Sequence, residues 1–357
     1  MKAAIWHGPG EMTVGDVPEP DCPADGILLE VTACGICGTD VRTFFNGDRR
    51  IEPGAVLGHE ICGRVLEVGG AVDGDVDADV DDLVHVISTL YCGRCRLCRD
   101  GNEHLCQRGG LMGFDYQGAY AERVAIPEVA LKNVFRIPAG LDDIHATFAD
   151  PLSDAICGHK DLDIGLEDRV VVIGAGPVGT AHVALALAQG ADVVHLLETS
   201  PARLELARSV LGDADVRYVD TTGIDPVEYV RGETGDGAER VIVACSNARA
   251  QEQAMEMAAP RGRVLFFGGL PKGTTSIAFP SNVLHYREVA VLGSYASRHR
   301  DQVQALEMLR RNTHNIRGVV TDVVPLEDAP EAFERIRRGD ALKVVVTPNS
   351  TGGERKP

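Results

Sequence analysis

Four cysteines fall within a short stretch of the first third of the chain. Their spacing is Cys92-x2-Cys95-x2-Cys98-x7-Cys106. Four thiolates this close together can surround one zinc ion and leave no position for a substrate, which defines a structural zinc site. The alternative is an iron–sulfur cluster, whose bacterial pattern also begins C-x2-C-x2-C but closes after three residues with a following proline. Here the last gap is seven residues and Gln107 follows, so the spacing favours zinc.

A second set of potential metal ligands is scattered over three short segments. They are Cys37 in Cys-Gly-Ile-Cys-Gly-Thr-Asp, His59 and Glu60 in Gly-His-Glu, and Asp150 in Asp-Pro-Leu-Ser. Taken singly, each is ordinary, because a cysteine near a strand end usually packs in a core and a lone histidine is usually hydrogen-bonded there. Together they supply a soft thiolate, an imidazole and carboxylates. This combination predicts an open zinc site that a substrate can reach.

A glycine-rich turn after a β-branched run predicts nucleotide binding. The run Val170-Val-Val-Ile leads directly into Gly174-Ala-Gly176-Pro177-Val178-Gly179, and a segment rich in Ala and Leu follows. The first glycine makes a tight turn, the second lets the backbone approach a pyrophosphate, and the third lets a helix pack on the strand. The start of that helix offers unpaired N–H groups to phosphates. The alternative is a tight strand–helix turn that binds no ligand.

An acidic residue nineteen positions after the last glycine bears on the choice of cofactor. Glu198 closes the apolar run 193–197, where a carboxylate can bind two ribose hydroxyls and repel a 2′-phosphate. This favours NAD. Arg203, five residues further on, could instead neutralise a phosphate, so NADP stays open as the alternative.

Length, charge and cysteine usage limit the classes of protein. A chain of 357 residues suggests about two domains. Its net charge of −18 argues against nucleic acid and anionic membranes as partners, since both require clustered basic residues. No apolar run reaches the ~18 residues of a membrane span, and the first residues lack a signal-peptide pattern. The ten cysteines suit metal binding better than a secreted disulfide framework, so we expect a cytoplasmic protein.

The pattern of apolar runs changes along the chain. Residues 1–150 read as β-rich, with short apolar runs separated by Gly, Pro and Asp and no long helical period. From Arg169 to about residue 295, six expected strands alternate with helices, which predicts a doubly wound parallel sheet. After residue 296 we expect two helices (301–311 and 326–338) and a terminal strand (343–346). The α/β domain is therefore inserted, and the last segment returns to the first domain.

The order of these motifs resembles that of the zinc-dependent medium-chain dehydrogenase/reductase superfamily, which includes the alcohol dehydrogenases. The motifs are GICGTD, GHE, the four-cysteine lobe, GAYAERVAIP at 118–127, DPLS and GAGPVG, and they cover essentially the whole chain. The sequence looks most similar to the sorbitol, threonine and polyol dehydrogenase branch. The resemblance implies a GroES-like catalytic domain (1–150, with the zinc lobe at 92–106), a Rossmann NAD(P)-binding domain (151–295) and a return to the catalytic domain (296–357). It also implies two zinc ions per subunit and a homodimer or homotetramer.

The same resemblance implies roles for individual residues. Cys37 and His59 would bind the catalytic zinc, and Glu60 would be a further ligand or a carboxylate beside the ligands. Asp150 stands where polyol dehydrogenases usually have Glu and alcohol dehydrogenases a second Cys, so it would bind zinc directly or through a water. Thr39 would pass the substrate proton outward. The implied reaction is oxidation of a secondary alcohol, polyol or sugar hydroxyl by hydride transfer to NAD(P).

Two positions depart from the family pattern. Arg42 stands where alcohol dehydrogenases often continue the proton relay with His, and a guanidinium cannot be the final base. Arg42 would instead bind a phosphate or an anionic substrate, or lie at the surface. Ser294-Tyr295 replaces an Arg-Tyr pair that polyol dehydrogenases of this branch tend to carry, which weakens the case for a sorbitol-like substrate. The alternatives are a dehydrogenase of threonine or another hydroxy compound, and a non-catalytic nucleotide-binding protein of the same fold.

Overall fold

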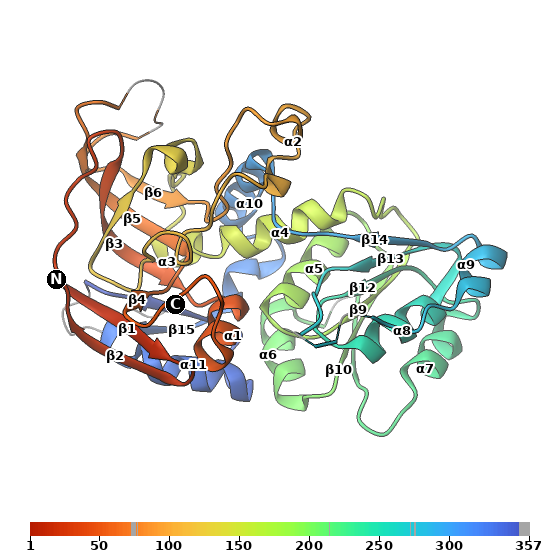
Figure 1. The fold of residues 1–357 in the computed structure, drawn as a ribbon. Helices are drawn as coiled ribbons and strands as arrows, with labels where there is room; N and C mark the ends of the chain where they lie inside the picture. Colours follow the sequence, from red (N-terminus) through yellow and green to blue (C-terminus); the bar gives the residue numbers. More distant parts are fainter. Residues whose placement is uncertain (73–75, 77, 214, 272, 275, 350–357) are drawn as a thin grey trace. The chain divides into compact units, whose positions relative to one another are not determined.

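The computed structural model describes residues 1–72, 76, 78–213, 215–271, 273–274 and 276–349. The chain forms two compact units (Figure 1). The first comprises Met1–Ser153, Ala296–Arg311 and Val320–Pro357, and the second comprises Asp154–Tyr295 and Asn312–Val319. In the described residues, no helix is both long and apolar enough to cross a membrane.

The first unit is built on two sheets. The smaller has the order β2-β1-β4, with antiparallel pairing, and the larger has the order β15-β16-β3-β5-β6-β8, with β7 also paired to β3. The strands are β1 (Lys2–Gly8), β2 (Glu11–Asp16), β3 (Ile27–Gly35), β4 (Ala55–Val56), β5 (Glu60–Val68), β6 (Leu83–Val86), β7 (Arg123–Ile126), β8 (Val134–Arg136), β15 (Val320–Pro325) and β16 (Lys343–Thr347). The terminal strand expected at 343–346 thus joins the sheet of the first unit, antiparallel to β3.

Most helices of the first unit before residue 149 are short, and sequence periodicity missed several of them. They are α1 (Gly38–Asn46), α2 (Arg96–Arg99), η1 (Glu103–Leu105), η2 (Glu128–Asn133), α3 (Asp143–Ala146), the start of α4 (Ala149–His159), α10 (His299–Arg311), η4 (Leu326–Asp328) and α11 (Ala329–Arg338). α1 has only nine residues, which is too few for a clear 3.6-residue pattern. The two helices expected after residue 296 are confirmed as α10 and as η4 continued by α11.

The second unit is the expected doubly wound sheet. Its six parallel strands have the order β11-β10-β9-β12-β13-β14, which is the nucleotide-binding arrangement 3-2-1-4-5-6. The strands are β9 (Arg169–Ile173), β10 (Val193–Glu198), β11 (Val216–Asp220), β12 (Ala238–Val243), β13 (Ala258–Phe266) and β14 (Ala290–Gly293). Both faces are covered by helices, as the near-continuous apolar strands require.

Successive side chains of β9 pack into two different hydrophobic cores, one on each face of the sheet. Val170 and Val172 pack in one core with side chains of α5 (Pro177–Ala188) and α6 (Pro201–Leu211), whereas Val171 packs in another with α7 (Pro226–Thr234) and α8 (Ala248–Met257). Successive residues of a strand point to opposite faces, so the two helix pairs cover opposite faces of the sheet. The remaining helices of the unit are α9 (Ser281–Arg287) and η3 (Thr313–Val319). The predicted fold class is confirmed.

Candidate functional site

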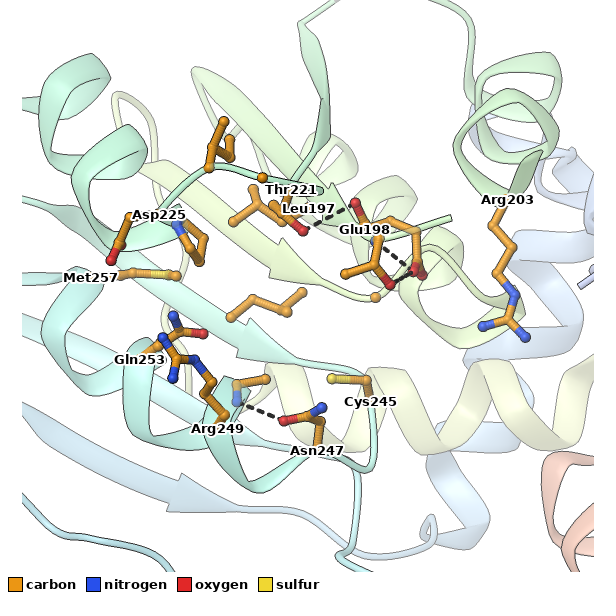
Figure 2. Close-up of a pocket in the computed structure, with 17 residues that line it drawn as sticks. Leu197, Glu198, Arg203, Thr221, Asp225, Cys245, Asn247, Arg249, Gln253 and Met257 are labelled. Carbon is orange, nitrogen blue, oxygen red and sulfur yellow. Dashed lines mark hydrogen bonds between the residues drawn. The ribbon is translucent and has the colours of Figure 1, made fainter. Parts of the chain in front are cut away.

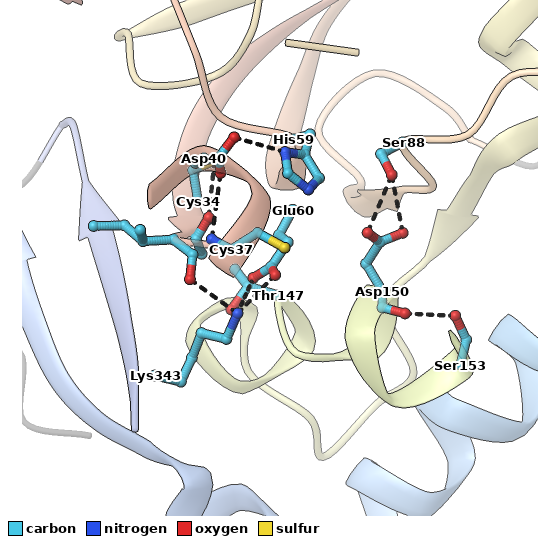
Figure 3. A network of polar contacts seen from close by, with 12 residues as sticks. Cys34, Cys37, Asp40, His59, Glu60, Ser88, Thr147, Asp150, Ser153 and Lys343 are labelled. Carbon is cyan, nitrogen blue, oxygen red and sulfur yellow. Dashed lines mark hydrogen bonds and ion pairs between the residues drawn. The ribbon is translucent and has the colours of Figure 1, made fainter. Parts of the chain in front are cut away.

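The register of β3 and β5 brings Cys37 and His59 together. Gly35, the last residue of β3, pairs with Glu60, the first residue of β5, and the two strands are antiparallel. Cys37, which follows β3, and His59, which precedes β5, therefore lie at the same end of this strand pair. The Cys37 thiol is a polar neighbour of the His59 imidazole, and both side chains lie within one polar network (Figure 3).

Cys37 occupies the N-terminal boundary of α1. It is the N-cap residue, in extended conformation, and is half-buried. A cysteine at this boundary presents its sulfur at the start of the helix, where it can serve as a metal ligand. Thr39 lies in the first turn of α1 and is half-buried, whereas Arg42 is exposed.

Asp40 fixes the orientation of His59. Its Oδ1 lies 2.9 Å from His59 Nδ1, and the carboxylate is completely buried. A carboxylate can only accept, so His59 donates through Nδ1–H, and Nε2 is left to act as a metal ligand. Burial alone would lower the pKa of His59, but the charges of Asp40 and Cys37 outweigh it and hold the pKa well above its ordinary value.

Glu60 is held in a buried ion pair with Lys343. Lys343 Nζ lies 2.6 Å from Oε1 and 2.8 Å from Oε2 of Glu60, and it also donates to the carbonyl oxygen of Ile36 at 3.0 Å. Burial lowers the pKa of Lys343, but the charge and hydrogen bond of Glu60 together with the charges of Cys37 and Asp40 outweigh it, and the net shift is upward. Both oxygens of Glu60 thus have a cationic partner on β16.

Asp150 has its own hydrogen-bond donors. Ser88 Oγ lies 3.3 and 3.1 Å from its two carboxylate oxygens, and Gln302 Nε2 lies 3.3 Å from Oδ1. Figure 3 shows the Asp150 carboxylate directed toward Ser88. Burial raises the pKa of Asp150 to about 6, although the nearby charge of His59 opposes the shift.

The four-cysteine lobe has the geometry of a zinc site. The sulfur atoms of Cys92, Cys95, Cys98 and Cys106 all lie within 4.8 Å of one another. A hydrogen bond from the backbone N–H of Arg94 lowers the pKa of Cys92 to about 6. Burial and the neighbouring thiols raise the pKa of Cys98 to about 12. A divalent cation removes this conflict, because it stabilises all four thiolates at once. The donor set therefore fits zinc.

The two sets of potential ligands differ in how closely they converge. Of the described residues, only the four cysteines of the lobe form a group of three or more ligand atoms within 4.8 Å of one another. In the second set, Cys37 and His59 are neighbours, while Glu60 is paired with Lys343 and Asp150 is hydrogen-bonded to Ser88. A thiolate beside an imidazole nitrogen remains a donor pair that zinc prefers.

The glycine turn of the second unit suits a pyrophosphate. Gly174 has φ +108°, and a side chain at Gly179 would overlap the carbonyl oxygen of Gly174. Nothing lies within 4 Å of the place where a side chain at Gly176 would be, so the backbone there is open to a ligand. Gly176 is the N-cap of α5 and Pro177 lies in its first turn. The free N–H groups in the first turn of α5 therefore lie at this opening.

Glu198 lies at the carboxyl end of β10 with four donors around it. Its Oε2 accepts from Ala175 N–H at 2.9 Å, and its Oε1 accepts from Thr199 N–H, Thr199 Oγ1 and Ser200 N–H at 2.7, 3.1 and 3.1 Å. The carboxylate lines a cavity of about 580 Å³, which Arg203 and Arg249 also line (Figure 2). This cavity opens at the strand ends where doubly wound sheets bind nucleotides.

Comparison with known proteins agrees with this geometry. The alcohol dehydrogenase GroES-like domain model matches residues 23–139, and the zinc-binding dehydrogenase model matches residues 177–311. L-threonine 3-dehydrogenase of Bacillus licheniformis is 32% identical, over 98% of this chain and 99% of that protein. The structure is similar to alcohol dehydrogenase TADH from Thermus sp. ATN1 (TM-score 0.88, 31% identical, 98% of this chain and 100% of that one). A structure from Sinorhizobium meliloti 1021 bound to NADP has a TM-score of 0.87 at 30% identity, covering 97% of this chain and 99% of that one.

The chain belongs to the zinc-dependent alcohol dehydrogenase family of medium-chain dehydrogenases/reductases. The resemblance seen in the sequence is confirmed. It is an enzyme, an oxidoreductase that uses zinc and NAD(P) to transfer a hydride from the hydroxyl group of a small molecule.

Several residues of the site were not singled out from the sequence. They are Asp40, Ser88, Tyr120, Gln302 and Lys343. Two of these residues could have been recognised from the sequence. Asp40 stands three residues after Cys37, where an acid can accept from the N-cap backbone, and Lys343 is a charge at the start of an apolar strand. Ser88 and Gln302 could not, since a lone polar residue is usually at the surface.

Proposed function

We propose that Cys37 and His59 hold the catalytic zinc of an NAD-dependent dehydrogenase that oxidises a secondary hydroxyl group. The observation that carries this is the hydrogen bond from His59 Nδ1 to the buried Asp40, which leaves Nε2 as the ring nitrogen that a metal could take, with the Cys37 thiol as a neighbour. A zinc ion held there would act as a Lewis acid on the substrate oxygen and lower the pKa of the hydroxyl. The first unit would then carry catalysis, and the second would bind the nucleotide.

The surrounding residues take supporting roles in this proposal. Asp150 acts through a bridging water rather than by direct contact with the metal, because Ser88 and Gln302 already engage its carboxylate. Glu60 stays beside the ligands, neutralised by Lys343. Thr39 passes the substrate proton outward from the first turn of α1.

The cofactor we propose is NAD rather than NADP. Glu198 is held by four donors, so it cannot readily turn away from the cavity to make room for a 2′-phosphate. A fixed carboxylate favours two ribose hydroxyls over a phosphate. Arg203 and Arg249 line the same cavity and are the residues that would favour NADP instead.

The experiment that tests this function is a metal analysis combined with a substrate panel. We expect two zinc atoms per chain and NADH formation with at least one secondary alcohol, among L-threonine, polyols and sugars. L-threonine leads the panel because a threonine dehydrogenase is a relative at 32% identity. We also expect a higher kcat/KM with NAD than with NADP. A single zinc atom together with no NADH from any compound would contradict the enzyme function, and a strong preference for NADP would contradict the cofactor.

We further propose that the enzyme is a homodimer or homotetramer in the cytoplasm. β14 is an edge strand of its sheet, and Phe279 and Tyr286, which precede it in the chain, are 52% and 78% exposed. An open edge strand and exposed apolar side chains are features suited to pairing with a second copy. The ten free thiols suit a reducing compartment. Light scattering should give at least twice the mass of 38.1 kDa, and Val291→Lys should reduce it to one chain; a monomeric wild-type protein would refute this.

A further inference from the structure

We propose that Tyr120 is a positioning residue for the catalytic metal site, which it orients through Asp40 and through the turn that precedes His59. Tyr120 lies in the GAYAE segment between the four-cysteine lobe and β7 and is completely buried. The inference rests on the proposed function, since it takes Cys37 and His59 as the metal-binding residues.

The hydroxyl group of Tyr120 is the first link. It lies 2.8 Å from Asp40 Oδ2 and 3.2 Å from the carbonyl oxygen of Gly35. The hydroxyl has one proton, and the charged, nearer carboxylate oxygen takes it. Asp40 thus accepts from Tyr120 and from the N–H of Cys37 on Oδ2, and from His59 on Oδ1.

Each of these bonds matters because Asp40 is closed off from solvent. Its side chain has 0% exposure, so no bulk water can replace a donor that is removed. Buried networks of this kind hold their members in one geometry only when every acceptor is satisfied. Loss of the Tyr120 hydroxyl would leave Oδ2 with only the Cys37 N–H at 3.3 Å. Asp40 would then hold the imidazole of His59 less firmly.

The ring of Tyr120 is the second link. Gly58, directly before His59, has φ +99°, and a side chain there would lie 2.9 Å from Tyr120 Cδ1. The ring also meets Phe333 edge to face at 5.8 Å between centroids, and Phe333 lies against Phe44 of α1 at 4.9 Å. Tyr120 therefore contacts the turn that carries His59 directly and α1, which carries Cys37, through Phe333.

The test separates the hydroxyl from the ring. Tyr120→Phe keeps the ring and removes only the hydroxyl, so the fold should be retained. Carboxylates that orient a zinc-bound histidine typically contribute 10- to 100-fold to metal affinity. Tyr120 acts one step further out, and we expect about a tenfold loss at the catalytic site by the same rule. Zinc retained per chain is measured after equilibration with increasing chelator, and the four-cysteine site of the same molecule serves as the internal standard.

A matched variant controls for the loss of a tyrosine hydroxyl. Tyr229 lies in the second unit, and its hydroxyl is 3.2 Å from His195 Nδ1. Tyr229→Phe should leave both zinc affinities unchanged. Cobalt substituted for zinc should show a changed visible spectrum in Tyr120→Phe and an unchanged one in Tyr229→Phe.

The outcomes distinguish this inference from the function on which it rests. Weaker zinc binding at the catalytic site alone in Tyr120→Phe, with the four-cysteine site unchanged, supports the positioning role. Two zinc ions held as firmly as in the wild type, or both weakened equally, would overturn that role and leave the proposed function intact. A wild-type protein that holds only the four-cysteine zinc would overturn both.

Discussion

Cys37→Ala is expected to retain one zinc ion instead of two and to lose at least about 1000-fold in kcat/KM. In the proposed site Cys37 supplies the thiolate ligand, and without it His59 alone would not hold the ion against water. Lewis-acid activation is worth several kcal/mol of transition-state stabilisation, and about 4 kcal/mol corresponds to the 1000-fold loss. Elemental analysis gives the zinc content, and NADH formation with the best compound of the panel gives the activity.

The control for this prediction is another buried thiol. Cys62 lies on β5 and is fully buried, with its sulfur 3.7 Å from His85 Nδ1. Cys62→Ala removes a sulfur atom of similar burial without touching the proposed ligands. It should keep two zinc ions and its activity, apart from a small loss of stability. If Cys37→Ala also kept two zinc ions, Cys37 would not be a ligand and the assignment of the site would fail.

Features that depend on neighbouring residues could be predicted from the sequence. The four cysteines converge because they lie within one short lobe, and the glycine turn joins a strand to the helix that follows it. The parallel sheet followed from alternating apolar runs and helices, since such crossovers allow few topologies. All six expected strands are present, because each is an apolar run bounded by turns.

Features that depend on distant pairing could not be predicted in the same way. Motif spacing predicted Glu60 as a zinc ligand or a carboxylate beside the ligands, but it could not identify its partner Lys343. That residue is 283 positions away and joins Glu60 through the pairing of β16 with β3. Asp150 likewise meets Gln302 across 152 residues of sequence. Which acceptor a buried donor finds is a property of the tertiary fold. Motif spacing therefore identified the candidate ligands but not the residues that hold them.

Lys343→Met should lower the free energy of unfolding of the first unit by about 3–5 kcal/mol, because it leaves the carboxylate of Glu60 buried without its cation. Glu60 is completely enclosed, and its Oε2 fills the space above Gly35, where a side chain would overlap it. The carboxylate therefore cannot turn to solvent. Urea unfolding in excess zinc measures the effect, since bound metal adds to stability and must be held constant. The single tryptophan, Trp6, is buried in the core of this unit and reports its unfolding by fluorescence.

Two further variants decide whether the loss comes from the buried charge. Lys2→Met breaks the ion pair of Lys2 with Asp16, whose side chains are 50% and 80% exposed, and should leave the urea midpoint unchanged. The double variant Glu60→Met/Lys343→Met removes both charges and should recover most of the stability lost in Lys343→Met, because replacing a whole buried pair by apolar residues is often neutral. If Lys343→Met unfolded at the wild-type midpoint, or if the double variant were less stable than the single one, the role of Lys343 would lie in something other than neutralising Glu60. Recovery of stability in the double variant would show that the loss in Lys343→Met comes from the unpaired charge of Glu60.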